Sequence, residues 1–331
     1  MTRATVYGRD LDGDGWPSVS VVMPVRDEAT HLARAVASVL AQDYPVPFEV
    51  CLAVAPSGDA TAEVAAALAA GDPRVTVTAN PAGVTPAGLN AAVAATSGEV
   101  IVRVDGHAEL APGYIRRAVA TMVRTGAVNV GGRQVPAPET PFEEAVAAAT
   151  TSWLGTGGAE YRVGGAEGPV DTVYLGVFDR AAGDAVGWFD ASLIRNQDYE
   201  LNIRLRAAGG TVWFDPELAV AYRPRGSWRA LARQYFEYGW WKAEVLRTHP
   251  GSWRARQVVP LANLVAQLAA LAALGRWRAA ALVPGGYLAA LAWGAGRQRR
   301  RGAWRTVLVA VTMHQAWAVG MLRGLVASPR R

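Results

Sequence analysis

Two side chains after a short apolar segment have the types and spacing to hold a divalent metal ion. The segment 99–104 is rich in β-branched residues and is followed by Asp105, Gly106 and His107. In an extended chain this alternation places Asp105 and His107 on the same side, and Gly106 lets the backbone come close to a ligand. A carboxylate and an imidazole suit a divalent cation that carries a diphosphate. A buried strand that ends in an ordinary polar turn is the alternative.

A second carboxylate lies where a helix is expected to begin. Asn196 can cap a helix over residues 197–208, which places Asp198 in the first turn. The helix macrodipole stabilises an ionised carboxylate there, and such a group can accept a proton. Ordinary acidity at a helix start is the alternative. Glu200 can either position a substrate or pair with a nearby arginine such as Arg204.

The elements that position these residues alternate between strands and helices. Strands are expected at 18–23, 48–54, 74–78 and 99–104, and the intervening helices end near Gln42, Gly71 and Gly98, with Asp59 as a possible cap of the second helix. This order predicts an α/β fold with a mostly parallel, doubly wound sheet. Ligands bind at the carboxyl ends of the strands in such sheets, where Asp105 is expected.

After His107 the pattern becomes less regular. Helices are expected at 112–125, 142–151 and 197–208, with a short one that ends at Gly187. Strands are expected at 127–131, 172–178, 212–214 and 218–222, the last two around a turn at Asp215 and Pro216.

Composition indicates a membrane surface rather than a nucleic acid as the charged partner. The 331 residues are 51% hydrophobic with a formal net charge of +5. The apolar excess and much of the positive charge gather after residue 257, where arginines flank apolar segments. Cys51 is the only cysteine, so a cysteine metal cluster is excluded and a core position is expected for it. The first 16 residues do not have the pattern of a signal peptide.

Three apolar segments near the end of the chain, at 257–274, 278–295 and 304–326, are candidates for membrane helices. A spanning helix needs about 20 apolar residues, so the third qualifies and the first two are marginal. The first two are joined by residues 275–277 and can form a hairpin. Arginines at 254, 256, 297 and 299–301 suit a cytoplasmic face, whereas Arg330 and Arg331 argue against an external C-terminus. Two to three membrane helices are expected.

The segment 227–248 before them is dense in aromatic and cationic residues. Such a helix suits the headgroup level of a membrane, and a helix that faces a protein core is the alternative.

Four motifs in order resemble the family 2 glycosyltransferases over residues 18–245. They are the segment Pro24 to Glu28, the strand end at Asp105, the segment Gln197 to Leu201, and the segment Gln234 to Trp241. The branch that the chain resembles is the bacterial succinoglycan-biosynthesis type, which the segments 313–317 and 322–324 also favour. The resemblance implies a GT-A fold, which is Rossmann-like, and an inverting transfer of sugar.

The resemblance also implies roles for single residues. Asp105 and His107 would hold Mg²⁺ or Mn²⁺ in place of the usual pair of aspartates, and Asp198 would be the catalytic base. Glu200, Gln234, Tyr238 and Trp241 would position the acceptor, although an arginine that the family has in the last motif is missing. Contacts to the donor would come from Pro24, Arg26, Glu28, Asp59, Asn90 and Asp105.

One departure from the family affects the donor. The family usually has an aspartate after its second strand that reads the nucleotide base, and here Val54, Ala55, Pro56 and Ser57 occupy that segment. The missing carboxylate removes a charge-assisted hydrogen bond of roughly 1.5–3 kcal/mol at a desolvated site. A UDP-sugar is the first choice of donor.

The sequence therefore predicts a membrane-anchored, metal-dependent glycosyltransferase that acts on a lipid-linked or polysaccharide acceptor in exopolysaccharide synthesis. It would be a multi-pass protein of the cell membrane with its catalytic domain in the cytoplasm. The alternatives are a synthase that transfers the sugar to polyprenyl phosphate, and a non-catalytic membrane scaffold. The expected parts are a tail (1–17), a GT-A domain (18–226), an amphipathic interfacial region (227–256) and a membrane domain (257–327).

Overall fold

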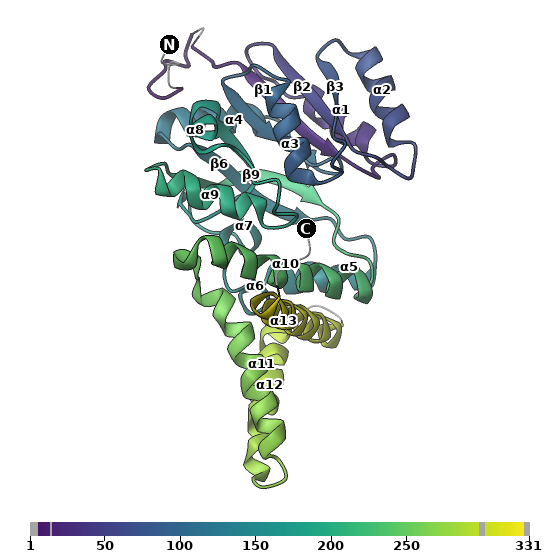
Figure 1. Ribbon diagram of the computed structural model, residues 1–331, viewed down its shortest axis with the longest axis vertical. Coiled ribbons are helices and arrows are strands. Elements are labelled where there is room, and N and C mark those ends of the chain that lie inside the picture. The colour runs from purple at the N-terminus through teal and green to yellow at the C-terminus, as the bar shows by residue number, and fades with distance from the viewer. Residues whose placement is uncertain (1–5, 14, 298–301, 328–331) are drawn as a thin grey trace. The chain divides into compact units, whose positions relative to one another are not determined.

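Apolar segments in the first part of the chain form strands that alternate with helices, as the sequence predicts. The computed structural model describes residues 6–13, 15–297 and 302–327 (Figure 1). The first four strands are Val19–Val25 (β1), Phe48–Val54 (β2), Val75–Ala79 (β3) and Val100–Arg103 (β4). The helices between them are Leu32–Leu40 (α1), Thr61–Gly71 (α2) and Thr85–Ala94 (α3).

The chain divides into two units. Unit 1 consists of residues 1–135 and 165–222, and unit 2 of residues 136–164 and 223–331. The segment 136–164 thus groups with the C-terminal residues, whereas the sequence suggested one continuous domain over 18–226. Each unit has a hydrophobic core of its own.

Unit 1 is built on a mixed sheet, which has nine strands among the described residues. The order β3-β2-β1-β4 is parallel throughout, which is the predicted doubly wound part. Beyond β4 the sheet continues with β8, which is antiparallel to β4, and then with β6, β9 and β5, while β7 pairs with β9. The strand β4 therefore lies inside the sheet, and its carboxyl end is next to that of β1.

The remaining elements of unit 1 extend the sheet and cover it. They are Glu109–Leu110 (β5), Tyr114–Thr125 (α4), Asn129–Pro136 (β6), Gly168–Pro169 (β7), Tyr174–Asp179 (β8), Arg180–Val186 (α8), Gln197–Ala207 (α9) and Val212–Tyr222 (β9). The prediction of two strands around Asp215 was wrong, because β9 is continuous. The Asp215 carboxylate accepts hydrogen bonds from Arg117, Thr121 and the Glu217 N–H, which satisfies it inside the strand.

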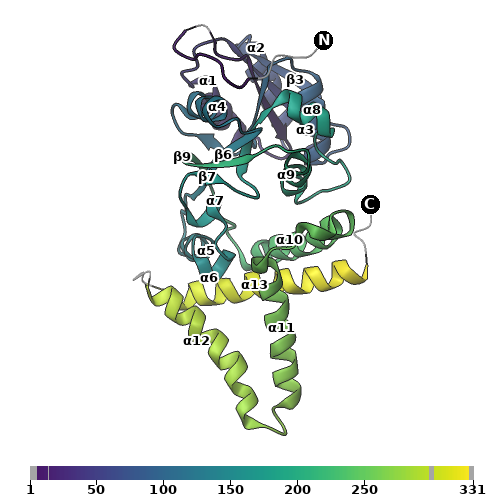
Figure 2. The same ribbon diagram turned by 90° about the vertical axis from the view of Figure 1, so that its left-hand side faces the viewer.

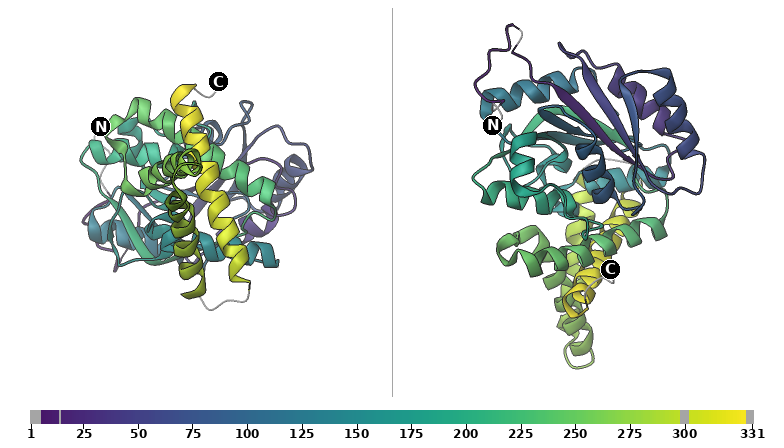
Figure 3. Two further views of the ribbon diagram at one scale, coloured as in Figure 1. Left: turned by 90° about the horizontal axis from the view of Figure 1, so that it is seen from below. Right: turned by 45° about the horizontal axis from the view of Figure 1, so that its top comes forward.

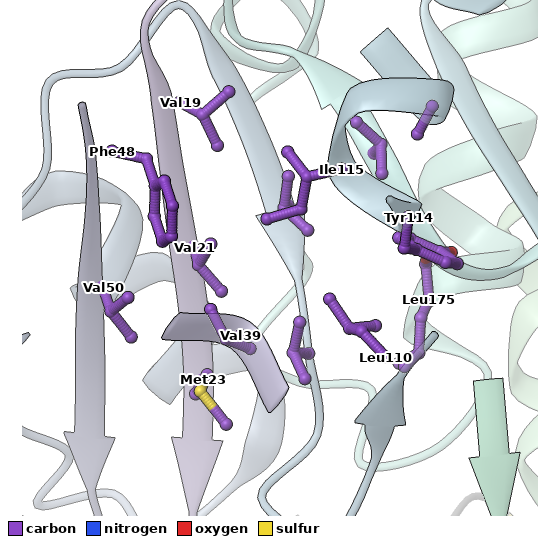
Figure 4. Packing of buried hydrophobic residues seen from close by; sticks show 14 of the residues in the cluster. Val19, Val21, Met23, Val39, Phe48, Val50, Leu110, Tyr114, Ile115 and Leu175 are labelled. Carbon is purple, nitrogen blue, oxygen red and sulfur yellow. The ribbon is translucent and has the colours of Figure 1, made fainter. Parts of the chain in front are cut away.

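Helices cover both faces of the sheet (Figure 3). Alternate residues of each strand point to opposite faces, so Val21 and Met23 pack with α1 and α4 whereas Val22 packs with α3 and α9. Figure 4 shows the first of these clusters around Val21, Met23 and Ile115. Cys51 is fully buried in the second cluster, as predicted.

Part of the expected N-terminal tail packs on unit 1. Val6 is buried in the core cluster of the sheet, and Arg9 forms an ion pair with Glu99 at the start of β4. The Trp16 ring packs edge-on against Tyr44. These contacts add the described residues before β1 to unit 1.

Unit 2 has a helical core. Its helices are Pro141–Thr150 (α5), Trp153–Thr156 (α6), Glu160–Val163 (α7), Trp228–Thr248 (α10), Ala255–Ala273 (α11), Leu282–Arg297 (α12) and Ala303–Val326 (α13). The helices α10 and α13 pack closely at two glycines. A Cβ atom at Gly239 would come within 2.0 Å of the Trp317 carbonyl oxygen, and one at Gly320 within 2.0 Å of that of Phe236. One face of α10 therefore forms part of a protein core, the alternative noted for this segment.

Two helices of unit 2 are long and apolar enough to cross a membrane, among the residues that the structure describes. They are α11 and the segment 278–297, with mean hydropathies of 1.2 and 1.3 and with 6% and 11% of their residues buried. The connection between α11 and α12 consists of residues 274–277 and the short helical turn Arg278–Ala281 (Figure 2). They match the first two apolar segments of the sequence.

The expectation that the third apolar segment spans a membrane is not supported. The helix α13 is not among the candidate spans found in the described part of the chain. Its residues Val309, Ala310 and Met313 are instead buried in the core of unit 2, which α5 and α10 share. Residues 299–301 and 330–331, which entered the topology argument, lie outside the described residues.

Candidate active site

Asp105 lies directly beyond the carboxyl end of β4, as the sequence predicts. The chain stays paired with β1 up to Val104, whose N–H donates to the Val22 carbonyl oxygen at 3.1 Å. The side chain of Asp105 is 20% exposed and that of His107 is 44% exposed. The first carboxylate is therefore held by the sheet, while the histidine lies nearer the surface.

Asp198 lies in the first turn of α9, which also agrees with the prediction. Its side chain is 34% exposed. Asn196 occupies the N-cap position in a left-handed conformation, with φ of 63°, and its side chain makes no capping hydrogen bond. The expected capping by the Asn196 side chain was therefore wrong.

Arg103 joins the two carboxylates. It is the last residue of β4, and its side chain is only 6% exposed. Its Nη2 donates to Asp105 Oδ1 at 2.8 Å, and its Nη1 donates to Asp198 Oδ1. Residues 93 positions apart in the chain thus share one guanidinium, and we call Arg103, Asp105 and Asp198 the carboxylate bridge. The sequence argument missed Arg103, although a lone cation inside an apolar strand is a signal that a buried partner exists.

Charge outweighs burial in setting the pKa values of Asp105 and Arg103. Burial by itself raises the pKa of the Asp105 carboxyl, but the positive charges of Arg103, His107 and Arg195 outweigh it and hold that pKa below its ordinary value. Burial likewise lowers the pKa of Arg103, and Asp105 and Asp198 outweigh it and raise that pKa. Asp105 is therefore ionised at neutral pH, in a form that can bind a cation.

Glu28 and His107 form a second pair beside the bridge. His107 Nδ1 lies 2.6 Å from Glu28 Oε1. A Cβ atom at Gly106 would come within 3.1 Å of Glu28 Cγ, so the glycine makes room for the approach. A carboxylate that holds one imidazole nitrogen fixes the orientation of the ring, as is common for histidines that bind metals. The prediction for Glu28 was a contact to the donor, and in this structure its side chain reaches His107.

The residues present fit a metal that is completed by its substrate. Among the described residues, no group of three or more histidine, cysteine or acidic side chains is placed to hold a metal ion. Asp105 and His107 supply at most two ligands by side chains, which matches the way Mg²⁺ and Mn²⁺ bind through one or two protein groups plus phosphate oxygens. Asp105 is the carboxylate that such a cation would use.

The loop after β1 is tied to the loop after β2. The Glu28 N–H donates to Thr61 Oγ1 at 2.8 Å, and the Ala29 N–H donates to Asp59 Oδ2 at 3.1 Å. The other oxygen of Asp59 accepts from the Thr61 N–H at 3.0 Å. Asp59 thus holds the loop in place with both oxygens. Its expected role as the N-cap of α2 was wrong, because Ala60 occupies that position, and its predicted contact to a donor stays a prediction.

The same loop presents two charged side chains. Asp27 has a left-handed backbone with φ of 54°, and its Oδ1 accepts from the Gly58 N–H at 2.7 Å. Arg26 Nη1 donates to the Gly83 carbonyl oxygen at 3.1 Å, and the Arg26 side chain stays 60% exposed. Pro24 is part of β1. The contacts predicted for Pro24 and Arg26 with a donor stay predictions.

Two other candidates have structural partners. The side-chain amide of Asn90 donates to the Phe189 carbonyl oxygen at 2.7 Å and accepts from the Phe189 N–H at 3.1 Å. Glu200 is buried and accepts two hydrogen bonds from Arg204, each 2.6 Å long. Of the two roles considered for Glu200, the structure shows the ion pair with Arg204. Asn90 joins α3 to the segment before α9.

Gln234, Tyr238 and Trp241 lie on one face of α10, because spacings of four and three residues match a helical turn. Trp241 is buried, and Tyr238 packs edge-on against Tyr235. All belong to unit 2, so their predicted role in positioning an acceptor stays a prediction.

Fold and site together define a glycosyltransferase with the GT-A fold. The sequence matches the family described as "Glycosyl transferase family 2" over residues 20–187, and the chain belongs to this family. It is 32% identical over 318 residues to the succinoglycan biosynthesis protein ExoA of Rhizobium meliloti (strain 1021). This alignment covers 94% of this chain and 96% of that protein.

A solved structure shares the fold. The mannosyltransferase PcManGT from Pyrobaculum calidifontis, in complex with GDP-Man and Mn²⁺, is similar with a TM-score of 0.70 and 16% identity, over 98% of this chain and 91% of that one. The S. aureus protein TarS, residues 1–349 with UDP, has a TM-score of 0.47 and 12% identity, over 92% and 90% of the two chains. The family match and the likeness to PcManGT confirm the GT-A fold expected from the sequence.

Proposed function

We propose that the chain transfers a sugar from a nucleotide-sugar donor to a saccharide or lipid-linked acceptor, with a divalent cation and with inversion at the anomeric carbon. The observation that carries the proposal is the carboxylate bridge. It brings a carboxylate suited to a metal–diphosphate, Asp105, next to a second carboxylate suited to accept a proton, Asp198. Both chemical needs of sugar transfer are met within unit 1.

The donor side uses the end of β4 and the loop after β1. Asp105 and His107 would hold the cation, and Glu28 keeps the His107 ring oriented. A bound Mg²⁺ or Mn²⁺ supplies positive charge against the diphosphate that leaves. Arg26 directly follows β1, which pairs with β4, and its exposed guanidinium would contact the phosphates or the nucleotide.

The acceptor side uses α9. Asp198 would take the proton from the acceptor hydroxyl as its oxygen attacks the anomeric carbon from the face opposite the diphosphate. One displacement without a covalent intermediate inverts the anomeric configuration. Asp198 lies in the first turn of α9, at the positive end of the helix macrodipole.

The proposed donor and cellular location are inferred from features outside the carboxylate bridge. A UDP-sugar is our first choice, and a GDP-sugar is the competitor, since a mannosyltransferase of this fold binds GDP-Man with Mn²⁺. The apolar surfaces of α11 and α12 support a membrane anchor, with unit 1 in the cytoplasm, where nucleotide sugars are made. The relative ExoA supports a role in the synthesis of an exopolysaccharide.

A screen of the full chain in detergent tests the proposal. The thermal unfolding temperature is measured with UDP- and GDP-sugars in the presence and absence of Mn²⁺, and donors that stabilise the protein are then assayed for release of the nucleoside diphosphate. The proposal expects stabilisation that depends on both metal and donor, followed by turnover in the presence of membrane lipids. Failure of every nucleotide sugar to bind would contradict it and leave the scaffold alternative. A polyprenyl-phosphate sugar as the final product would identify the synthase alternative.

A further inference from the structure

Arg103 is a buried cation between two carboxylates that have separate tasks in the proposed reaction. Its guanidinium donates from one terminal nitrogen to each carboxylate, from Nη2 to Asp105 and from Nη1 to Asp198. Its Nε is also buried and has no hydrogen-bond partner among the described residues. The guanidinium is thus placed by its two carboxylates rather than by the backbone around it.

We propose that Arg103 is a positioning residue that keeps the base Asp198 beside the cation site at Asp105 but off the cation itself. This inference rests on the proposed function. Both contacts use the Oδ1 atom of the carboxylate, so a second oxygen of each can face substrate. Arg103 therefore links the strand that holds the donor to the helix that carries the proton acceptor.

Two carboxylates in one site can lose this arrangement when a divalent cation recruits both of them as ligands. Asp198 would then no longer accept a proton from the acceptor. A permanent cation between Asp105 and Asp198 prevents this outcome.

Arginine is suited to this task in a way that lysine is not. The planar guanidinium presents two terminal nitrogens at once and stays charged at any pH of interest. A lysine at position 103 would keep the charge but offer a single ammonium centre, so it would hold one carboxylate at the expense of the other. Charge and bridging geometry can thus be separated by substitution.

The decisive experiment compares metal binding with turnover. Arg103→Met removes one positive charge from beside Asp105, so affinity for Mn²⁺ in the presence of UDP should rise roughly three- to tenfold. Turnover should fall about 100-fold or more, because Asp198 is lost as base. Binding is measured by Mn²⁺ titration of the full chain in detergent, and turnover by release of the nucleoside diphosphate from the donor found in the screen. A residue that only stabilises the fold would lower both quantities together.

Arg117→Met is the matched control. Arg117 also pairs with a buried carboxylate of unit 1, Asp215, but it takes no part in the bridge. This variant should leave Mn²⁺ affinity and turnover per folded molecule unchanged. Tighter Mn²⁺ binding in both variants would show a general effect of lost charge and overturn the proposal.

Arg103→Lys keeps the test decisive if Arg103→Met does not fold. It should bind Mn²⁺ within about twofold of the wild type, because the charge is kept, yet turn over at least roughly tenfold more slowly. Wild-type turnover in Arg103→Lys, or weaker Mn²⁺ binding in folded Arg103→Met, would overturn the positioning role. Failure of the proposed function itself would give a different result from failure of the positioning role. In that case the wild type and Asp105→Asn would bind Mn²⁺ and UDP equally.

Discussion

Replacement of Asp198 by asparagine should separate catalysis from folding. The change is nearly isosteric, and the amide oxygen can still accept the hydrogen bond from Arg103 Nη1. A charge-assisted bond becomes a neutral one, which costs on the order of 1 kcal/mol of stability, and less here because the Asp198 side chain is about a third exposed. Loss of a general base lowers turnover by roughly 10²- to 10⁴-fold, or about 2.7–5.5 kcal/mol in the activation barrier. The predicted kinetic effect is therefore clearly larger than the predicted effect on stability.

The assay is the initial rate of nucleoside diphosphate release by the full chain in detergent, with Mn²⁺ and the donor identified by the screen. Donor binding by calorimetry should stay within a few-fold of the wild type, because Asp105 is intact. Glu200→Gln is the comparison, since Glu200 is buried and held by Arg204. It should lower the unfolding temperature more than Asp198→Asn and turnover less. Near-wild-type turnover in Asp198→Asn with an inactive Glu200→Gln would make Glu200 the base, and activity in both would refute the mechanism.

Three further predictions concern the metal, the membrane and acid stability. Asp105→Asn should abolish metal-dependent donor binding while His107→Asp keeps it, and unchanged donor affinity of Asp105→Asn in calorimetry would reject the assignment. The full chain should stay with membranes after high salt and alkaline carbonate, as its α11 and α12 imply, and release by carbonate would indicate a peripheral protein. Burial raises the pKa of Asp215, but hydrogen bonds from Arg117 and its neighbours outweigh it and hold that pKa low. The stability from the ionised carboxylate is present above the ordinary pKa of about 3.9 and is lost as the pH falls through the lower folded pKa. The unfolding temperature of the wild type should therefore exceed that of Asp215→Asn at pH 7 and approach it at low pH, and a constant gap would contradict this.

The parallel half of the sheet could be predicted because its signals are local. The strands β1, β2 and β4 are short, mostly apolar runs, and β3 alternates valine with threonine. Each connection carries its own turn residues, so the local pattern locates these strands. The position of Asp105 follows directly, since a residue just after a parallel strand lies at the ligand-binding edge. Asp198 follows from the start of α9 together with the family resemblance.

The bridge itself could not be predicted because it depends on the contact between Arg103 and Asp198, which are 95 residues apart in the chain. Arg103 lies in an apolar strand, where periodicity treats it as an exception rather than as a partner of Asp198. Glu200 shows the opposite case, because the spacing of four residues to Arg204 in a helix made their pairing an explicit alternative. Contacts between residues close in the sequence could thus be predicted, whereas contacts between distant elements could not.

Tertiary packing also overrode two local signals. Asp215 and Pro216 are typical turn residues, but Arg117 and Thr121 of α4 satisfy the carboxylate and allow β9 to continue. The last apolar segment was long enough to suggest a spanning helix, whereas α13 buries Val309, Ala310 and Met313 against α5 and α10. Length and hydropathy do not distinguish a helix that faces lipid from one that faces other helices.

The central claim is that Asp105 binds the metal–diphosphate while Asp198, held by Arg103, stays off the metal as the base. Crystals of the protein grown with Mn²⁺ and a non-reactive analogue of its nucleotide sugar test this claim most directly, through the anomalous scattering of Mn²⁺. The account predicts a Mn²⁺ peak about 2.0–2.3 Å from a carboxylate oxygen of Asp105, in contact with the diphosphate, with Asp198 outside coordination distance. A peak away from Asp105, or one coordinated by Asp198, would contradict it.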